Sequence, residues 1–160
     1  MEWLHRGNPT TLGAASGTIA GLATITPAAG FVGPNAAIAI GLLAGLCCYG
    51  AVAAKTKLGY DDSLDVVGIH GVGGIVGTLC VGIFASTIIN PGGADGLLSG
   101  GGFRLLGNQF LGVLVVGVYA FVLSWILLKI VDSIMGLRVS EETEMQGLDL
   151  SEHVETAYGS

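Results

Sequence analysis

A single ionisable ring interrupts the apolar stretch Val66-Val-Gly-Ile-His70-Gly-Val-Gly-Gly74-Ile-Val-Gly77. No Asp, Glu, Lys or Arg occurs from Val66 to Ala94, a run long enough to cross a bilayer. An ionisable side chain at membrane depth is costly, and such residues mark functional sites that have a specific partner. His70 is therefore the first candidate functional residue, and the run around it predicts a membrane-spanning helix.

The composition of the whole chain indicates an all-α integral membrane protein. Of its 160 residues, 51% are hydrophobic and 11% are charged, whereas soluble domains carry about 25% charged residues. The 28 glycines suit membrane helices, in which close backbone approach drives packing. Nothing in this composition favours nucleic acid as a partner. Cys47, Cys48 and Cys80 lie in apolar runs without a C-x-x-C pattern, so we interpret them as packing residues and expect no bound metal.

Proline, glycine and charge divide the chain into four predicted spans. The stretch 7–54 contains 48 residues without charge, too many for one crossing of about 20, and Thr26-Pro27 to Gly33-Pro34 provides the break. Gly13, Gly17 and Gly21, then Gly41 and Gly45, then Gly73 and Gly77 form small-residue stripes that we expect to pack helix against helix. The membrane portion is 1–131, with spans at about 11–26, 36–54, 64–88 and 107–131, and an acidic tail follows at 132–160.

The basic residues predict the orientation of these spans. Four crossings place five of the six basic residues on one side and leave Arg104 on the other. The positive-inside rule makes the first side cytoplasmic, so both termini are expected there. The five are Arg6, Lys55, Lys57, Lys129 and Arg138.

Two segments and the tail carry a family resemblance. They are Leu12-Gly-Ala-Ala-Ser16 through Thr26-Pro27-Ala-Ala-Gly30, then Asp61-Asp62-Ser-Leu-Asp65 through His70 to Gly77, with Gly136-Leu-Arg-Val and Gly147-Leu-Asp-Leu-Ser-Glu-His153 in the tail. Together they closely resemble the Amt branch of the ammonium transporter (Amt/Mep/Rh) family. The resemblance implies an eleven-helix inverted-repeat channel fold in the cell (plasma or inner) membrane, a homotrimer, and a transport protein rather than an enzyme, without cofactors. It covers only helices eight to eleven and the cytoplasmic tail, so it implies a partial version that lacks the first seven helices.

The same resemblance assigns pore residues, and physical chemistry supports one of them. His70 matches the second of two paired pore histidines, and a ring at this depth should be neutral, with one N–H donor and one acceptor. By resemblance, Val66, one α-helical turn before His70, and Ile19, on the face of Ser16, line the pathway for ammonia. Ser16 and Thr26 are placed near the pathway too, although hydroxyls in helices also bond their own carbonyls. The structural alternative for His70 is a core histidine bonded to a backbone carbonyl.

Three carboxylates open the third span at its N-terminus, and two interpretations of them remain open. Asp61, Asp62 and Asp65 suit the positive end of a helix dipole, which makes them caps. The functional interpretation is that they attract cations to an inner vestibule or hold that vestibule together. The sequence alone does not separate these roles.

The tail suggests regulation. Composition alone predicts a solvated, disordered end. By resemblance the tail packs under the bundle, couples the subunits of a trimer and receives a P-II signalling protein. The residues that carry this interpretation are Gly136, Arg138, Gly147, Asp149, Ser151, His153 and Tyr158.

Transport of ammonium or ammonia, with methylammonium as an analogue, is thus the leading functional hypothesis. An ammonium sensor that uses the same fold as a signalling platform is the alternative. A proton-relay or metal-binding membrane subunit is disfavoured, because no second His, Asp or Glu lies at membrane depth in the spans to complete such a site.

Overall fold

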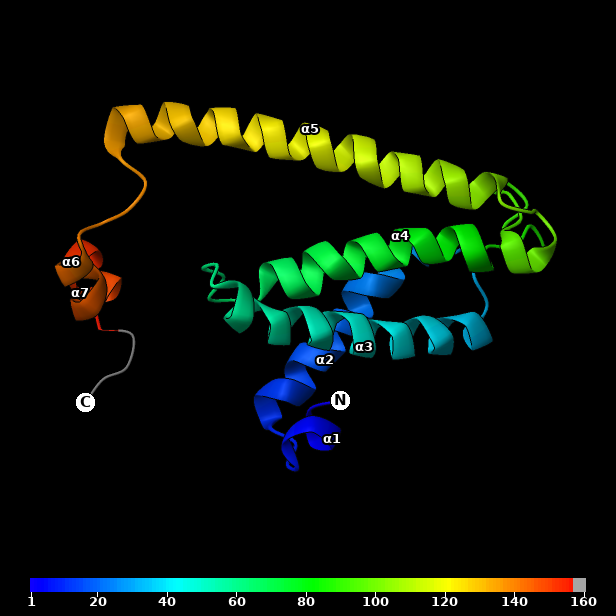
Figure 1. The fold of residues 1–160 in the computed structure, drawn as a ribbon, viewed down its shortest axis with the longest axis horizontal. Helices are drawn as coiled ribbons and strands as arrows, with labels where there is room; N and C mark the ends of the chain where they lie inside the picture. Colours follow the sequence, from blue (N-terminus) through cyan, green and yellow to red (C-terminus); the bar gives the residue numbers. More distant parts are fainter. Residues whose placement is uncertain (157–160) are drawn as a thin grey trace. The chain divides into compact units, whose positions relative to one another are not determined.

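A computed structural model describes residues 1–156, and within this range all regular structure is helical (Figure 1). The α-helices are α1 (Glu2–Arg6), α2 (Thr11–Ile25), α3 (Pro34–Leu58), α4 (Val72–Phe84), α5 (Arg104–Met135), α6 (Glu141–Gln146) and α7 (Leu148–His153). Three other helical turns are a 3-10 turn η1 (Thr26–Ala28), a π-helix η2 (Val67–Gly71) and a 3-10 turn η3 (Leu97–Ser99). The prediction of an all-α protein is confirmed.

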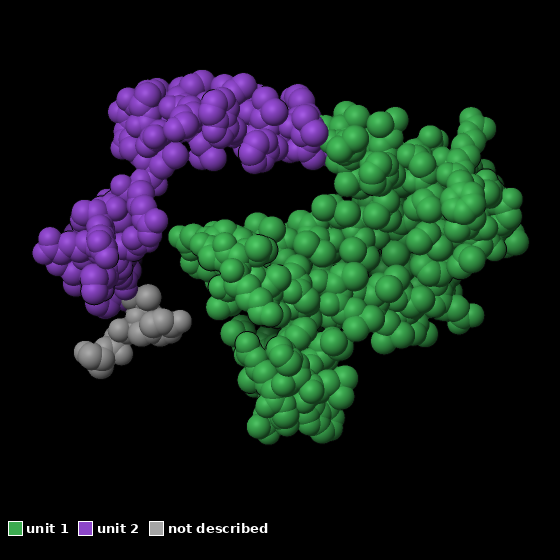
Figure 2. All heavy atoms as spheres, in the orientation of Figure 1, with its two compact units in different colours: residues 1–115 green, residues 116–160 purple. Residues whose placement is uncertain are grey.

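The chain divides into two compact units, at Val115 (Figure 2). The first unit, Met1–Val115, holds α1 to α4 and the beginning of α5. The second unit begins at Val116 and holds the remainder of α5 together with α6 and α7. The residues around His70 all belong to the first unit.

Helix ends in the first unit follow the predicted breakers. The 3-10 turn that follows α2 carries Pro27 in its first turn. Helix α3 begins at Pro34, where the missing N–H costs nothing because the first turn has no acceptor for it. It ends at Gly59, whose φ of 70° is left-handed, a conformation that glycine adopts without steric cost.

Three helical segments of the described chain are long and apolar enough to cross a membrane: Pro34–Leu58, Val67–Phe84 and Arg104–Met135. The segment expected at 64–88 is shorter at both ends, because Asp65 has a positive φ of 57° and Ala85 leaves the helix with ψ 145°. The α2 segment contains 15 residues and is not among the three. Its crossing of the membrane stays a prediction.

Small residues at intervals of four build the helix contacts of the first unit, in which α3 and α4 lie side by side and α2 packs against both (Figure 1). Thr24 is completely buried, and its Oγ1 donates to Ala20 O at 2.7 Å. A Cβ on Gly77 would overlap the carbonyl of Thr24. The buried stripes are Ala20, Thr24 and Ala28 in α2–η1, Ile40, Ala44 and Cys48 in α3, and Gly73 and Gly77 in α4.

The expectation for the glycine stripes is therefore right for α4 and wrong within this chain for α2 and α3. A Cβ on Gly17, Gly21, Gly41 or Gly45 would meet nothing within 4 Å. The packed stripes lie one residue before these glycines, at Ala20 and at Ile40 with Ala44, which is about 100° away around the helix. In α2 and α3 the glycine face and the buried face lie next to each other in the sequence, and residue size alone does not show which of the two packs against another helix.

The connector between α4 and α5 is an ordered loop. The Asp95 carboxylate accepts from the backbone N–H of Thr87 at 2.7 Å and from its hydroxyl at 3.0 Å. Gly96 N donates to Ala85 O at 2.8 Å and Gly101 N donates to Gly96 O at 2.9 Å. A Cβ on Gly101 would overlap the carbonyl of Asp95, so glycine is needed where the loop folds onto itself. The loop therefore sets how α5 begins.

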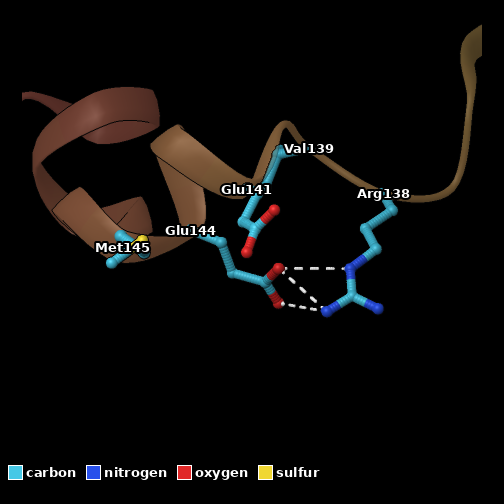
Figure 3. A pocket seen from close by; sticks show the side chains of 5 residues that line it. All are labelled: Arg138, Val139, Glu141, Glu144 and Met145. Atoms are coloured by element: carbon cyan, nitrogen blue, oxygen red, sulfur yellow. Dashed lines mark hydrogen bonds and ion pairs between the residues drawn. The ribbon is translucent and has the colours of Figure 1, made fainter.

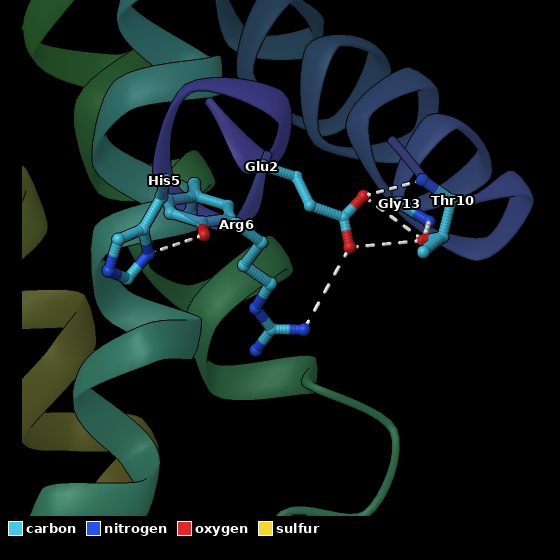
Figure 4. Close-up of polar contacts among 6 residues, drawn as sticks. Glu2, His5, Arg6, Thr10 and Gly13 are labelled. Atoms are coloured by element: carbon cyan, nitrogen blue, oxygen red, sulfur yellow. Dashed lines mark hydrogen bonds and ion pairs between the residues drawn. The ribbon is translucent and has the colours of Figure 1, made fainter. Parts of the chain in front are cut away.

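A short helix at the amino end braces α2 and α3 (Figure 4). The Glu2 carboxylate accepts from Thr10 N and from Thr10 Oγ1, both at 3.0 Å, and Thr10 in turn accepts from Gly13 N as the N-cap of α2. These bonds, led by the one from Thr10 N, lower the pKa of Glu2 below its ordinary value. His5 Nδ1 lies 2.8 Å from the hydroxyl of Tyr49 on α3.

Candidate functional site

His70 lies in the π-helix η2, which begins after a polar loop. A π-helix has i→i+5 hydrogen bonds and a wider turn than an α-helix; it occurs mostly as single turns inside α-helices, frequently at functional sites. Here Val72 N donates to Val67 O, and α4 continues directly from this turn. The site is therefore built on an irregular turn inside a membrane-length helical segment.

The Asp62 side chain caps this turn. Its Oδ1 accepts from Val66 N and its Oδ2 accepts from Val67 N, both at 2.9 Å. A carboxylate satisfies two of the donors that a helix start leaves without partners, and the negative charge suits the helix dipole. Asp62 thus has the capping role that was one of its two interpretations. Asp61 is exposed and lies farther out in the same loop.

Lys55, near the end of α3, binds the same loop. Its Nζ donates to the carbonyl of Asp62 at 2.7 Å and forms an ion pair with the carboxylate of Asp65. The two side chains are 23% and 29% exposed, so the ion pair is partly shielded from solvent. A left-handed φ costs a non-glycine residue about 1–3 kcal/mol, and Asp65 holds this conformation while it contacts Lys55.

The inner side of η2 packs on α2 and α3. Ile69 is buried with Ala20 and Cys48, and Cys48 Sγ donates to Ile69 O at 3.7 Å. A Cβ on Gly68 would lie 2.7 Å from the Val52 side chain and 3.2 Å from its backbone nitrogen, so α3 and η2 approach closely. These contacts fix which side of η2 faces the bundle.

His70 is exposed, next to the buried pair Gly68 and Ile69. In the described part of the chain its imidazole makes no hydrogen bond or ion pair. The bond to a backbone carbonyl that the structural alternative requires is therefore not formed within residues 1–156. Both ring nitrogens are open to a partner from outside this packed unit.

The other predicted pathway residues, in the first unit, are exposed or half-buried. Val66 is 49% exposed and Ile19 is 45% exposed, while Ser16 is half-buried. Thr26 is exposed, and its Oγ1 donates to Leu22 O at 2.6 Å, the self-bonding that is common for helix hydroxyls. The structure thus brings Asp62 and Asp65 together through Lys55, and no hydrogen bond or ion pair joins the five pathway residues to one another within residues 1–156.

The turn that contains His70 is a π turn rather than the α-helical turn that the sequence predicted. Val66 directly precedes this turn, and its place on the same face as His70 stays a prediction. The π turn left no mark in residue composition, since Gly68 and Gly71 are equally compatible with an α-helix in a membrane.

Sequence reasoning missed two residues of this region. Thr24 gave a signal in retrospect, because it stands midway between Ala20 and Ala28 in a second small-residue stripe. Lys55 also gave one, because it is the first charge after 48 uncharged residues and faces three carboxylates across a short connection. A basic residue so close in sequence to several acids is better interpreted as a partner in an ion pair than as a marker of membrane orientation alone.

In the tail, the described residues form two short helices, so the disordered end that composition alone predicts is not what the structure shows. Arg138 pairs with Glu144 through Nε at 3.1 Å and Nη2 at 2.9 Å, beside a surface pocket lined also by Val139, Glu141 and Met145 (Figure 3). Gly136 and Gly147 have positive φ at the helix ends. The remaining tail residues are less informative: Ser151 Oγ donates to Gly147 O, Asp149 and His153 lie on α7, and Tyr158 lies outside the described residues.

A search of residues 1–156 finds no group of three or more His, Cys, Asp or Glu side chains that could hold a metal ion. An apolar pocket of about 230 Å³ lies in the first unit, between η1, α4 and the connector to α5. Pro27, Phe31, Val81, Ala85 and Leu105 are among the residues that line it. It is separate from the contacts of η2 described above.

The fold and this region define an all-helical integral membrane protein in which the ionisable side chain of His70, inside a membrane-length helical segment, is exposed on an irregular turn. The model of the Ammonium Transporter Family matches residues 1–158. The chain belongs to that family, which consists of transport proteins rather than enzymes. The predicted resemblance is confirmed.

Individual relatives agree with this assignment. The ammonium transporter of Bacillus subtilis is 46% identical over 159 residues, which are 99% of this chain and 39% of the relative. Ammonium transporter Amt1 of Archaeoglobus fulgidus is 50% identical over 158 residues, again 99% of this chain and 39% of the relative. The crystal structure of Candida albicans Mep2 matches with a TM-score of 0.81 at 35% identity, covering 94% of this chain and 34% of Mep2. The chain thus spans somewhat over a third of the length of these relatives.

Proposed function

We propose that this chain forms the carboxyl-terminal part of an ammonium transport pathway, with His70 as a pathway residue. The observation that carries the proposal is the position of His70: its imidazole is exposed, and without a partner among the described residues, within an apolar helix of a member of the ammonium transporter family. A neutral imidazole offers one donor and one acceptor to a small polar molecule, and a second such ring could share its proton.

The proposed pathway includes the other residues of the sequence prediction. Val66 and Ile19 would provide apolar surface, and Ser16 within α2 and Thr26 directly after α2 would provide hydroxyls. Asp61, Asp62 and Asp65 would make the inner mouth attractive to cations, in addition to their contacts with the loop. In this proposal the chain lacks the part of the pathway that the other helices of a full-length relative would supply.

The proposed assembly is a homotrimer in the cell membrane, with both termini of this chain in the cytoplasm. The tail would couple the subunits and receive a P-II signalling protein. Membership of the ammonium transporter family supports these statements, and the two ordered helices α6 and α7 provide a surface for such a partner.

An uptake assay tests the proposal. The full chain is joined to the portion of the Bacillus subtilis transporter that it does not cover, and labelled methylammonium uptake is measured in cells without their own ammonium uptake. We expect uptake by the hybrid and a fall of at least about tenfold for His70→Ala, which corresponds to about 1.4 kcal/mol in a transport barrier. Ile75→Ala, a change of an exposed residue on α4, is the matched control and should retain uptake.

Normal uptake by His70→Ala at equal membrane levels would contradict the pathway role. The alternative, an ammonium sensor, predicts a different result. A sensor hybrid would show little uptake with or without His70, while ammonium would still change the protection of the tail from proteolysis.

A further inference from the structure

The segment that carries His70 is held before and after the π-helix, and within the π-helix Gly68 and Ile69 pack on α2 and α3. Before the π-helix, the Asp62 carboxylate binds Val66 N and Val67 N. After it, Gly73 and Gly77 lie against Thr24, so closely that a Cβ on Gly73 would lie 2.9 Å from Thr24 Oγ1. Neither contact has room to slide, because the first consists of directed hydrogen bonds and the second of backbone packing.

Between these two points the helix contains one residue more than α geometry accommodates. The extra residue is taken up as the π turn Val67–Gly71. An α-helix advances about 100° per residue, so a π turn that relaxes to α geometry must rotate one side of the turn against the other by about that amount. Because Gly73 and Gly77 are held on α2, the side that rotates is the one before them, which includes His70. This rotation also moves Gly68 and Ile69 away from their packing on α2 and α3.

Lys55 contacts the point at which the extra residue could leave the helix. Its Nζ binds both the carbonyl of Asp62 and the carboxylate of Asp65, and it does so from α3, a different element. Asp65 has the left-handed φ of 57° that separates the loop from the helix. If Asp65 returned to a helical φ, the helix would begin earlier. The extra residue could then leave the π turn, which would relax to α-helical geometry.

We infer that Lys55 is a positioning residue: through Asp65 and the Asp62 carbonyl it keeps the extra residue inside the helix and so sets the direction in which His70 points. The structural part of this inference stands on the contacts above. Its consequence for transport rests on the proposed function of His70.

Hydrogen exchange tests the structural part without any transport measurement. In the full chain in lipid nanodiscs, Lys55→Met removes the charge and keeps the length of the side chain. We expect the amides of Gly68, Ile69, His70 and Gly71 to exchange at least about tenfold faster, and the imidazole signals of His70 to shift. Lys57→Met is the matched control, because Lys57 is exposed two residues further along α3, and it should leave both readouts unchanged.

A reversed pair separates positioning from a general loss of stability. Lys55→Asp together with Asp65→Lys restores an ion pair between the same two positions but not the donation to the Asp62 carbonyl, so it should recover part of the protection that either single change removes. Amide exchange in α5 should stay constant throughout. Equal protection of residues 68–71 in Lys55→Met and the unchanged chain would overturn the inference, and so would a reversed pair that recovers nothing.

The hybrid transporter described above gives the functional readout. We expect Lys55→Met to lower the maximal rate of methylammonium uptake about tenfold with a smaller change in the half-saturating concentration, because the pathway residue is misdirected while the outer part is intact. If the unchanged hybrid takes up methylammonium and Lys55→Met takes it up equally well, the positioning role is overturned. The proposed function is not affected by that result. Absence of uptake by the unchanged hybrid counts against the proposed function alone, and the exchange data then decide the positioning role.

Discussion

Gly77 and Gly45 belong to similar small-residue stripes but have opposite surroundings. At Gly77, an added methyl group would overlap the carbonyl of Thr24 and lie 3.2 Å from Pro27 Cδ. At Gly45, an added methyl group would meet no atom within 4 Å. The Thr24 carbonyl belongs to the backbone of α2, so relief at Gly77 requires movement of a whole helix rather than of one side chain.

The change Gly77→Ala should therefore destabilise the first unit by about 1–3 kcal/mol, the range for overpacking a tight core. Gly45→Ala should change stability by less than about 1 kcal/mol and in the favourable direction, since alanine is the better helix former. Reversible unfolding of the full chain in mixed micelles measures both. Equal stabilities for the two variants would contradict the packing of α4 on Thr24.

Residue chemistry explains why His70 stands out in the sequence, whereas the sequence signal of Lys55 is weaker and its role is clear only from its contacts. A histidine in an uncharged run is conspicuous whatever the fold, because its cost in a membrane does not depend on its neighbours. Lys55 has a role only through the positions of Asp62 and Asp65, which depend on a left-handed residue between a loop and a helix. Ordinary topology rules count Lys55 as one more cytoplasmic charge.

Among the elements, α1 is attached to α2 by a carboxylate. Glu2 holds Thr10, the N-cap residue of α2, by its backbone N–H and by its hydroxyl (Figure 4). Because these bonds favour the charged carboxylate, the pKa of Glu2 lies below its ordinary value of 4.5. A group with a depressed pKa in the folded state stabilises the fold above its unfolded pKa and loses this effect as the pH falls through the folded value.

Acidification should therefore release α1 from α2 only below about pH 4.5. The Thr10 amide resonance of the full chain, followed by NMR from pH 7 to pH 3, reports this step. Glu2→Gln should abolish the pH dependence of that resonance, and Glu152→Gln, a change at an exposed acid in α7, should leave it unchanged. A Thr10 resonance that moves between pH 5 and 7 would exclude Glu2 as its cause.

Element ends were predictable where proline or glycine determines them, and the interior of the third span was not. Pro34 begins α3 because proline fits the first turn of a helix and disrupts its interior, and this effect can be recognised from the sequence alone. The π turn depends on a balance between two distant contacts, the Asp62 cap and the packing of Gly73 on Thr24. No local preference of Val67 to Gly71 specifies it.

For the whole molecule, the number of crossings determines where its ends lie. Three segments of the described chain have the length and apolarity of membrane spans, and α2 has only 15 residues, or about 22 Å of α-helix. The hydrocarbon core is about 30 Å thick, so α2 would need its continuation through η1 or a locally thinner bilayer to cross. The close packing of α2 on α4 favours a crossing, because α4 is itself part of a membrane-length segment.

Reporters fused to the two ends decide between four crossings and three. With four, a reporter that is active only in the cytoplasm should be active at both the amino and the carboxyl end. With three, one of the two ends should be inactive. An active reporter at one end and an inactive one at the other would show that α2 lies on one side of the membrane.

A one-residue deletion inside a membrane helix ordinarily rotates one half of the helix against the other by about 100° and brings the wrong side chains into contact. The turn Val67–Gly71 is the exception in this chain, because it already contains a surplus residue between two held points. Removal of one residue there would convert the turn to α geometry while the Asp62 cap and the Gly73 contact stay in place. Such a deletion would keep these two held points, while the packing of Gly68 and Ile69 on α2 and α3 and the orientation of position 70 would change.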